Sequence, residues 1–162
     1  MTRATGRAEA ELGAWVAGLP APERTGAVRA AGAAALHDAI ERYGAGGRFD
    51  DDQLARLTVL LTKPSVREAA WAAITDGEPH VRLWTDVVRR VEPRLVSAPA
   101  CLLGVAAWRA GNGALAAMAL ERALREDPAD QVAAVLMDGL ALGLPPSVLD
   151  RPGHPDGGRR AG

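Results

Sequence analysis

Apolar residues recur every three or four positions along most of the chain, and prolines and glycines end each run. This spacing is typical of helices that bury one face. It predicts helices over residues 8–17 and 23–43, and further helices that begin at Asp50, Ser65 and Pro79. No segment shows the strict alternation or the β-branched content of a strand. The sequence therefore predicts an all-α fold, a small domain of antiparallel helix pairs.

Two of these helix starts have the spacing of a capping box, in which the N-cap side chain and the side chain three residues later exchange hydrogen bonds with the backbone. Asp50 with Gln53 forms one such pair, and Ser65 with Glu68 forms the other. Both pairs precede apolar runs. We expect a capped helix at each.

Glycine-rich and aperiodic segments suggest a division of the chain. Residues 1–7 have no apolar pattern and are expected to fray, and the glycines of 44–47 are interpreted as a hinge. The chain then divides into N-terminal helices with the hinge (1–48), a compact all-α domain (49–150) and a tail (151–162). The tail has no apolar periodicity and is expected to be disordered.

In the segment 97–128, the apolar spacing predicts two closely packed helices, over 98–110 and 114–126, with a turn at Gly111–Gly113 between them. Its small and large residues follow the spacing of a tetratricopeptide repeat. The match is partial, because Ala100 stands where that repeat usually has tryptophan. A last helix is expected from Asp130 through Leu142.

Composition and charge limit the cellular locations and the classes of partner that we expect for this protein. The formal net charge of −1 gives no overall field that would attract nucleic acid or an anionic membrane. The single cysteine, Cys101, forms no internal disulfide and suits a reducing cytosol. No run reaches the roughly 18 apolar residues of a membrane span, and the first residues lack the apolar core of a signal peptide. We predict a cytoplasmic protein without membrane contact.

No catalytic, cofactor or metal site is predicted. The three histidines (His37, His80 and His154) are too far apart for the two-histidine spacing of a helical metal site. Apolar neighbours around Cys101 indicate a buried, inert thiol. The acidic run 50–52 is explained by helix capping, and 44–47 lacks the Lys-Ser/Thr of a phosphate loop. The sequence indicates a protein that is not an enzyme.

Arginines in the segment 82–94 raise the alternative of nucleic-acid binding. Arg82 and Arg89 share a helix face, but Asp86 lies between them, one turn from each. This pattern favours a solvated, salt-bridged face. Binding through Arg82, Arg89, Arg90 and Arg94 is the weaker interpretation.

Residues 56–146 resemble the C-terminal part of an actinobacterial family known as domain of unknown function 4192. The matching residues are Ser65–Ala70, His80, Leu83-Trp84, Ala98-Pro99, Leu102-Leu103, Ala106–Trp108, Gly111–Ala116, Ala119-Leu120, Arg122–Leu124, Asp127-Pro128 and Pro145-Pro146. Members of that family usually carry a longer N-terminal α/β-like portion. The resemblance therefore implies a C-terminal half and brings no active site with it.

The hypothesis that follows is a non-enzymatic interaction domain that binds a protein segment or a second copy of itself. Tetratricopeptide-like helix pairs present a concave face to a peptide or helix. We place the contact surface on the helix over 98–110 and its neighbours, with Trp84, Trp108, Arg109 and Asn112 as candidate residues. The alternative is an accessory C-terminal half of an enzyme or nucleotide-handling protein whose α/β part is absent here.

Overall fold

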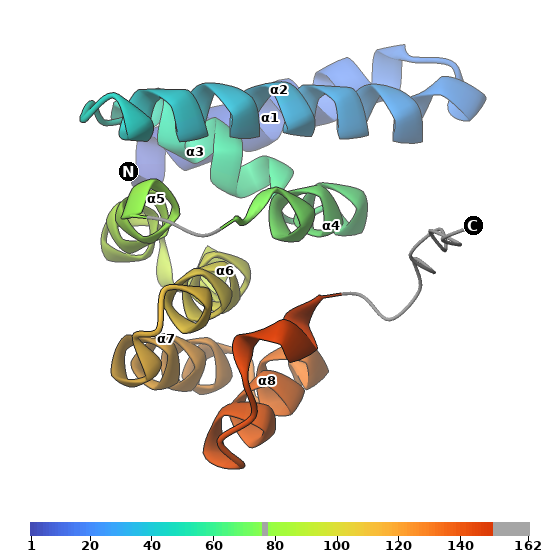
Figure 1. Cartoon of the computed structure of the whole chain (residues 1–162). Helices are drawn as coiled ribbons and strands as arrows, with labels where there is room; N and C mark the ends of the chain where they lie inside the picture. Colours follow the sequence, from blue (N-terminus) through green and yellow to red (C-terminus); the bar gives the residue numbers. More distant parts are fainter. Residues whose placement is uncertain (76–77, 151–162) are drawn as a thin grey trace, which may run out of the picture.

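The computed structural model describes residues 1–75 and 78–150, and within these the regular secondary structure consists of helices, without a strand. The prediction of an all-α fold is confirmed (Figure 1). The helices are α1 (Thr2–Gly18), α2 (Arg24–Gly44), α3 (Asp51–Leu60), α4 (Pro64–Ala73), α5 (Glu78–Arg90), α6 (Ser97–Arg109), α7 (Gly113–Glu126) and α8 (Gln131–Ala141). Short 3₁₀ turns lie at Ala21–Glu23, Pro93–Leu95 and Pro146–Leu149.

The helices form a stack with the two longest at one end. α1 packs on α3, and α2 packs on α3, α4 and α5. From α5 onward each helix packs on the next, in the order α5, α6, α7, α8 (Figure 1). α8 therefore lies at the far end of the stack from α1 and α2, with α6 and α7 as its helical neighbours.

The first helix begins earlier than predicted. α1 starts at Thr2, and residues 1–7 are not frayed. Ala4 and Thr5 are buried, and the Met1 ammonium lies 3.4 Å from Asp51 Oδ2 at the start of α3. Tertiary packing against α3 thus stabilises a first turn that the apolar pattern alone does not indicate.

One of the two predicted capping boxes is confirmed. The Gln53 backbone N–H donates to Asp50 Oδ1 at 2.8 Å, and the Asp50 N–H donates to Gln53 Oε1 at 3.1 Å. The box at Ser65 is wrong: α4 begins at Pro64, with Lys63 as the N-cap and no side-chain cap. Proline suits the first helical position because its missing N–H would have no partner there, and this places Ser65 inside the first turn.

The helix pair α6–α7 matches the predicted hairpin in position. Gly111 takes a left-handed φ of 75° after α6, and the Asn112 side chain accepts a hydrogen bond from the Leu115 N–H at 3.0 Å. A Cβ at Gly104 would lie 2.9 Å from Leu120, so the two helices approach closely at this point. The relation to tetratricopeptide repeats stays a prediction.

One hydrophobic core runs through the stack without a break at the glycine-rich segment. It contains buried residues of every helix from α2 to α8. At the predicted boundary after residue 48, Tyr43 and Phe49 pack edge to face with ring centroids 6.0 Å apart. The predicted parts 1–48 and 49–150 therefore share a core. The predicted tail, 151–162, lies outside the described residues.

Candidate functional site

The four predicted surface residues do not form an exposed surface. Trp84 is 1% exposed and Trp108 is 5% exposed, so both belong to the core. Arg109 pairs with Asp150 at 2.7 Å, and Asn112 caps α7. The prediction that the two tryptophans lie on a contact surface is therefore wrong. They are buried because α6 packs against α5, α7 and α8.

Trp108 shows why α6 cannot present its aromatic residue to a partner. A Cβ at Gly139 of α8 would lie 3.1 Å from Trp108 Cη2. The indole thus fills the space that a side chain at position 139 would need. Its role is to join α6 to α8, which agrees with aromatic packing as the default for tryptophan in an apolar helix.

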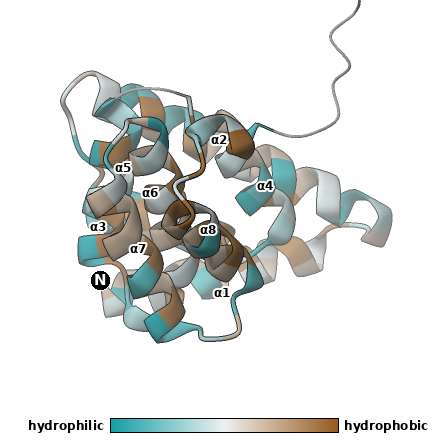
Figure 2. Ribbon diagram, turned by 60° about the horizontal axis from the view of Figure 1, so that its bottom comes forward, coloured by the Kyte–Doolittle hydropathy of each residue, from teal (hydrophilic) through white to brown (hydrophobic). Residues whose placement is uncertain are grey.

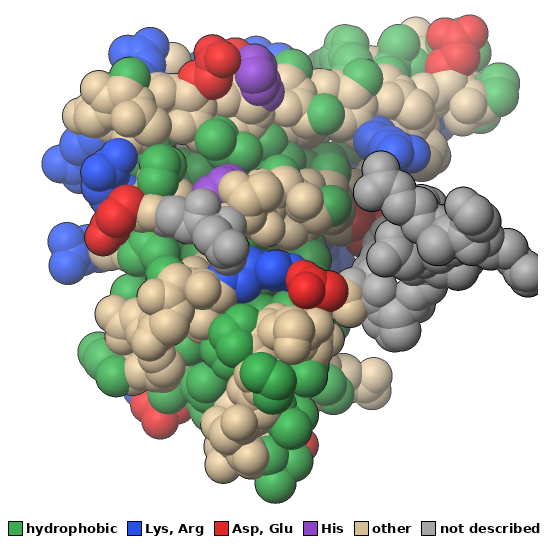
Figure 3. All heavy atoms as spheres, viewed as in Figure 1, with side chains coloured by type: hydrophobic (Ala, Val, Ile, Leu, Met, Phe, Trp, Pro, Cys, Tyr) green, Lys and Arg blue, Asp and Glu red, His purple; other side chains and the backbone are tan. Residues whose placement is uncertain are grey.

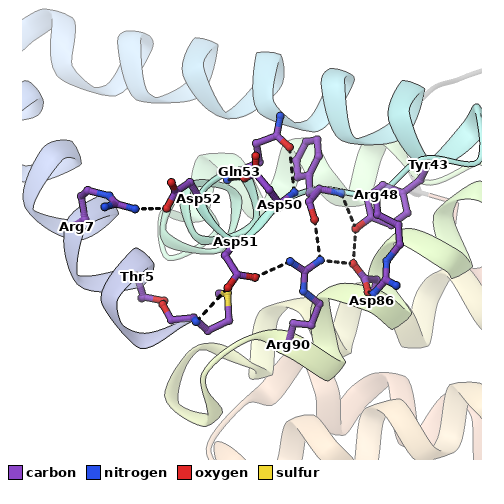
Figure 4. A network of polar contacts seen from close by, with 12 residues as sticks. Thr5, Arg7, Tyr43, Arg48, Asp50, Asp51, Asp52, Gln53, Asp86 and Arg90 are labelled. Atoms are coloured by element: carbon purple, nitrogen blue, oxygen red, sulfur yellow. Dashed lines mark hydrogen bonds and ion pairs between the residues drawn. The ribbon is translucent and has the colours of Figure 1, made fainter.

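Among the described residues, a network of interacting charged side chains surrounds Asp86 (Figure 4). Tyr43 Oη donates to Asp86 Oδ2 at 2.5 Å, and Arg90 Nη1 donates to the same oxygen at 2.8 Å. Arg48 donates to Asp86 Oδ1. Arg90 also binds Asp51 Oδ1 at 2.7 Å. The network connects α2, α3 and α5.

The network keeps Asp86 ionised although it is buried. Burial opposes the charged carboxylate, but hydrogen bonds from Tyr43, Arg48 and Arg90 outweigh this, and the pKa of Asp86 lies below its ordinary value. Burial, followed by the hydrogen bond to Asp86, raises the pKa of Tyr43 to about 12. The carboxylate oxygens are thus occupied by fixed donors, and we interpret the network as a structural one.

The predicted solvated face, with Asp86 between Arg82 and Arg89, is not found, because Asp86 is buried. Asp86 does not pair with Arg82 or Arg89; Arg82 instead donates to the Tyr43 carbonyl at 2.8 Å. Arg94 pairs with Glu9 at 2.7 Å and with Glu92 at 3.1 Å. Three of the four arginines of the predicted stripe, Arg82, Arg90 and Arg94, therefore have separate acidic or carbonyl partners.

Two further predicted groups are buried. Burial lowers the pKa of His80, whose Nε2 lies 3.4 Å from Thr75 Oγ1. Burial, and then the nearby Asp130 carboxylate, raises the pKa of the Cys101 thiol, which lies 3.7 Å from Asp130 Oδ2. A thiol held neutral in this way is a poor nucleophile.

Neither a metal cluster nor a membrane span appears in the described segments. Within 1–75 and 78–150, no three His, Cys, Asp or Glu side chains come together as a metal site would require. Among the helices of those segments, none has the length and apolar character needed to cross a bilayer.

Apolar side chains gather on the surface at the C-terminal end of the stack. Seven large hydrophobic residues of the described segments are exposed, and six of them lie between residues 118 and 148. They are Met118, Val132, Val135, Leu142, Leu144 and Val148. Figure 3 shows hydrophobic side chains over α7 and α8 at the lower end of the molecule.

α8 is the centre of this surface. Its only polar side chains are Gln131 and Asp138. It buries Ala133, Leu136 and Gly139 toward the rest of the protein, whereas Val135 is 70% exposed and Leu142 is 76% exposed. Figure 2 colours the ribbon by hydropathy, and α8 is labelled near the centre of the view. A helix that is apolar on nearly all sides is typically covered on more than one side.

An apolar groove borders α8 on the side of α7. Its volume is about 340 Å³, and it is lined by Gly113, Ala117, Met137, Leu140 and Ala141. A second depression, of about 230 Å³, lies between α1, α2 and α3 beside Trp15 and Arg56. The first of these is lined by α7 and α8, the helices that also carry the exposed Met118, Val132 and Val135.

The sequence already contained the signal for this site. The apolar residues of 130–142 occupy more than one helix face, and a helix covered on one side only needs a single stripe. The sequence predicts only a last helix over this run, because sequence alone does not say how many neighbours a helix has. The fold supplies that information.

Comparison with known proteins gives a family. Residues 1–147 match the family described as Domain of unknown function (DUF4192). No curated protein and no solved structure matches significantly. The match includes all of α1 to α8, so the likeness extends beyond the predicted range of 56–146. The chain belongs to the family Domain of unknown function (DUF4192).

Proposed function

We propose that this chain is a non-enzymatic interaction domain of the cytoplasm that binds an apolar helix on α8. The observation that carries this proposal is the exposure of Val132 and Val135 in α8 and of Leu142 directly after it, although α8 already buries Ala133, Leu136 and Gly139 against the protein. In helical stacks, terminal helices normally present a polar outer face that keeps the protein soluble. The exposed residues of α8 include only two polar side chains, Gln131 and Asp138.

The spacing of these residues favours a helix as the bound element. Val132 and Val135 are three residues apart, and Val135 and Leu142 are seven apart, which is the spacing of a and d positions in a helix pair. We name the exposed members, Val132, Val135 and Leu142, the α8 stripe. A partner helix with its own apolar stripe would pack along it.

The test compares affinity capture by the wild type, Leu142→Asp and Trp15→Ala. Leu142→Asp places a charge on the α8 stripe, whereas Trp15→Ala removes an exposed hydrophobic residue at the other end of the stack. We expect a near-stoichiometric protein with the wild type and with Trp15→Ala, and its loss with Leu142→Asp. The captured protein, or a differently tagged copy of this chain, is then mixed with purified bait to establish direct binding.

Circular dichroism of each variant keeps this test interpretable, because Leu142 is exposed and its replacement should leave the melting temperature nearly unchanged. Equal capture by the wild type and a folded Leu142→Asp variant would refute α8 as the binding surface.

A further inference from the structure

The composition of α8 points to the identity of its partner. We infer that the α8 stripe binds the α8 stripe of a second copy, in an antiparallel pair around a two-fold axis. This inference rests on the proposed function. A partner must bring an exposed apolar helix, and outside residues 118–148 the described segments expose one large hydrophobic residue, Trp15. In a second copy, α8 is the helix that meets this requirement.

The stripe is self-complementary in an antiparallel arrangement. Val132 and Leu142 lie equally far from Met137 in sequence, on either side of it. A two-fold axis beside Met137 therefore places Val132 opposite Leu142 of the second copy, and the two Val135 side chains on either side of the axis. Val132 and Leu142 thus meet each other, and Val135 lies opposite Gly139 of the second copy.

Charge also favours a second copy. A two-fold axis brings charged groups that lie close to it near their own counterparts, so a self-pairing helix tolerates few charges beside the axis. Within Gln131–Ala141 the only charged side chain is Asp138. By contrast, α5 carries Glu78, Arg82, Asp86, Arg89 and Arg90. α8 can therefore approach a second α8 with one like-charged pair at the edge.

The expected dimer is weak. A stable interface commonly buries about 800 Å² from each partner. Such an interface has about 20 residues on each side, whereas the α8 stripe has three, with Leu144 beside Gly139. We therefore expect a reversible dimer that forms in the micromolar range or above.

Sedimentation velocity over a concentration series up to the millimolar level tests the inference. We expect concentration-dependent dimers for the wild type and for Trp15→Ala. Val135→Asp should weaken association by at least about tenfold, because it removes an apolar side chain that the dimer would bury and brings two carboxylates together. Asp138→Asn should strengthen association about twofold at low salt, since it removes the like-charged pair beside the axis.

Each result decides one point. A wild type that stays monomeric throughout, or a dimer that Val135→Asp leaves intact, overturns self-association through α8. An Asp138→Asn variant that fails to associate more strongly overturns the antiparallel register beside Met137. If the wild type is monomeric but captures a protein that Leu142→Asp fails to capture, self-pairing is refuted and the proposed function stands. If neither capture nor sedimentation responds to the substitutions in the α8 stripe, both self-pairing and the proposed function are refuted.

Discussion

Asp86 keeps its negative charge in a nearly buried position because its donors come from three parts of the chain. Tyr43 ends α2, Arg48 lies in the connection to α3, and Arg90 is one turn further along α5. Removal of the carboxylate leaves two guanidinium groups without this partner. Such a loss costs more than breaking an exposed ion pair, because the remaining groups are partly desolvated.

Asp86→Asn should lower the free energy of unfolding by about 2 kcal/mol at neutral pH. The pKa of Asp86 is lowered in the folded state, so its stabilising effect is present above the unfolded pKa of about 4. The effect is lost as the pH falls through the lower folded pKa. Urea titrations at several pH values should show a gap between wild type and variant that closes on acidification.

Asp38→Asn provides the control for this prediction. Asp38 is an exposed carboxylate of α2 with no ion pair to residues in 1–75 or 78–150. Its replacement should change stability by less than about 0.5 kcal/mol at every pH. Equal effects of the two substitutions would contradict a special role for the Asp86 network.

Residue roles could be predicted where they depend on local neighbours. The pairing of Asp50 with Gln53 and the left-handed Gly111 follow from a few adjacent positions. Two of the partners of Asp86 could not be predicted, because Tyr43 and Arg48 are about forty residues away in sequence and meet it only in the folded protein.

At the scale of helices, two glycines of α2 have the same propensity but different surroundings. A Cβ at Gly32 would lie 2.5 Å from Val66 Cγ2 of α4, whereas a Cβ at Gly26 would meet nothing within 4 Å. Val66 is fully buried and its branched side chain has little freedom to move. Gly32 is thus required by the packing of α2 on α4, and Gly26 is not.

Gly32→Ala should therefore destabilise the protein by about 1–2 kcal/mol, since overpacking outweighs the gain in helix propensity. Gly26→Ala should instead stabilise it by about 0.5 kcal/mol. Thermal unfolding followed by circular dichroism separates these outcomes. In the double variant Gly32→Ala/Val66→Ala, the loss of stability should be smaller than the sum of the losses of the two single variants. A double variant whose loss equals this sum would argue against direct contact between the two positions.

Helix positions could largely be predicted from apolar spacing and from the glycines and prolines between runs. The errors have local physical causes. α1 extends to Thr2 because it packs on α3, and Pro64 rather than Ser65 sets the start of α4. The candidate surface on α8 could not be predicted, because an apolar helix in the interior and one at the end of a stack have the same pattern.

At the scale of the whole molecule, the connection after α2 does not separate two cores. Val28, Leu36 and Tyr43 of α2 belong to the same hydrophobic cluster as residues of α3 to α8. The Asp86 network also crosses this boundary, through Tyr43 and Arg48. These contacts make residues 1–48 part of the folding unit.

Residues 49–150 expressed alone should therefore fail to fold cooperatively. Loss of α1 and α2 exposes the faces of α3, α4 and α5 that they cover and removes two donors from Asp86. The full chain should unfold in a single transition, with helical circular dichroism and tryptophan fluorescence changing together. The four tryptophans lie in α1, α4, α5 and α6, so fluorescence reports on both sides of the boundary. A fragment that melts sharply, or two separate transitions in the full chain, would instead support the division at residue 48.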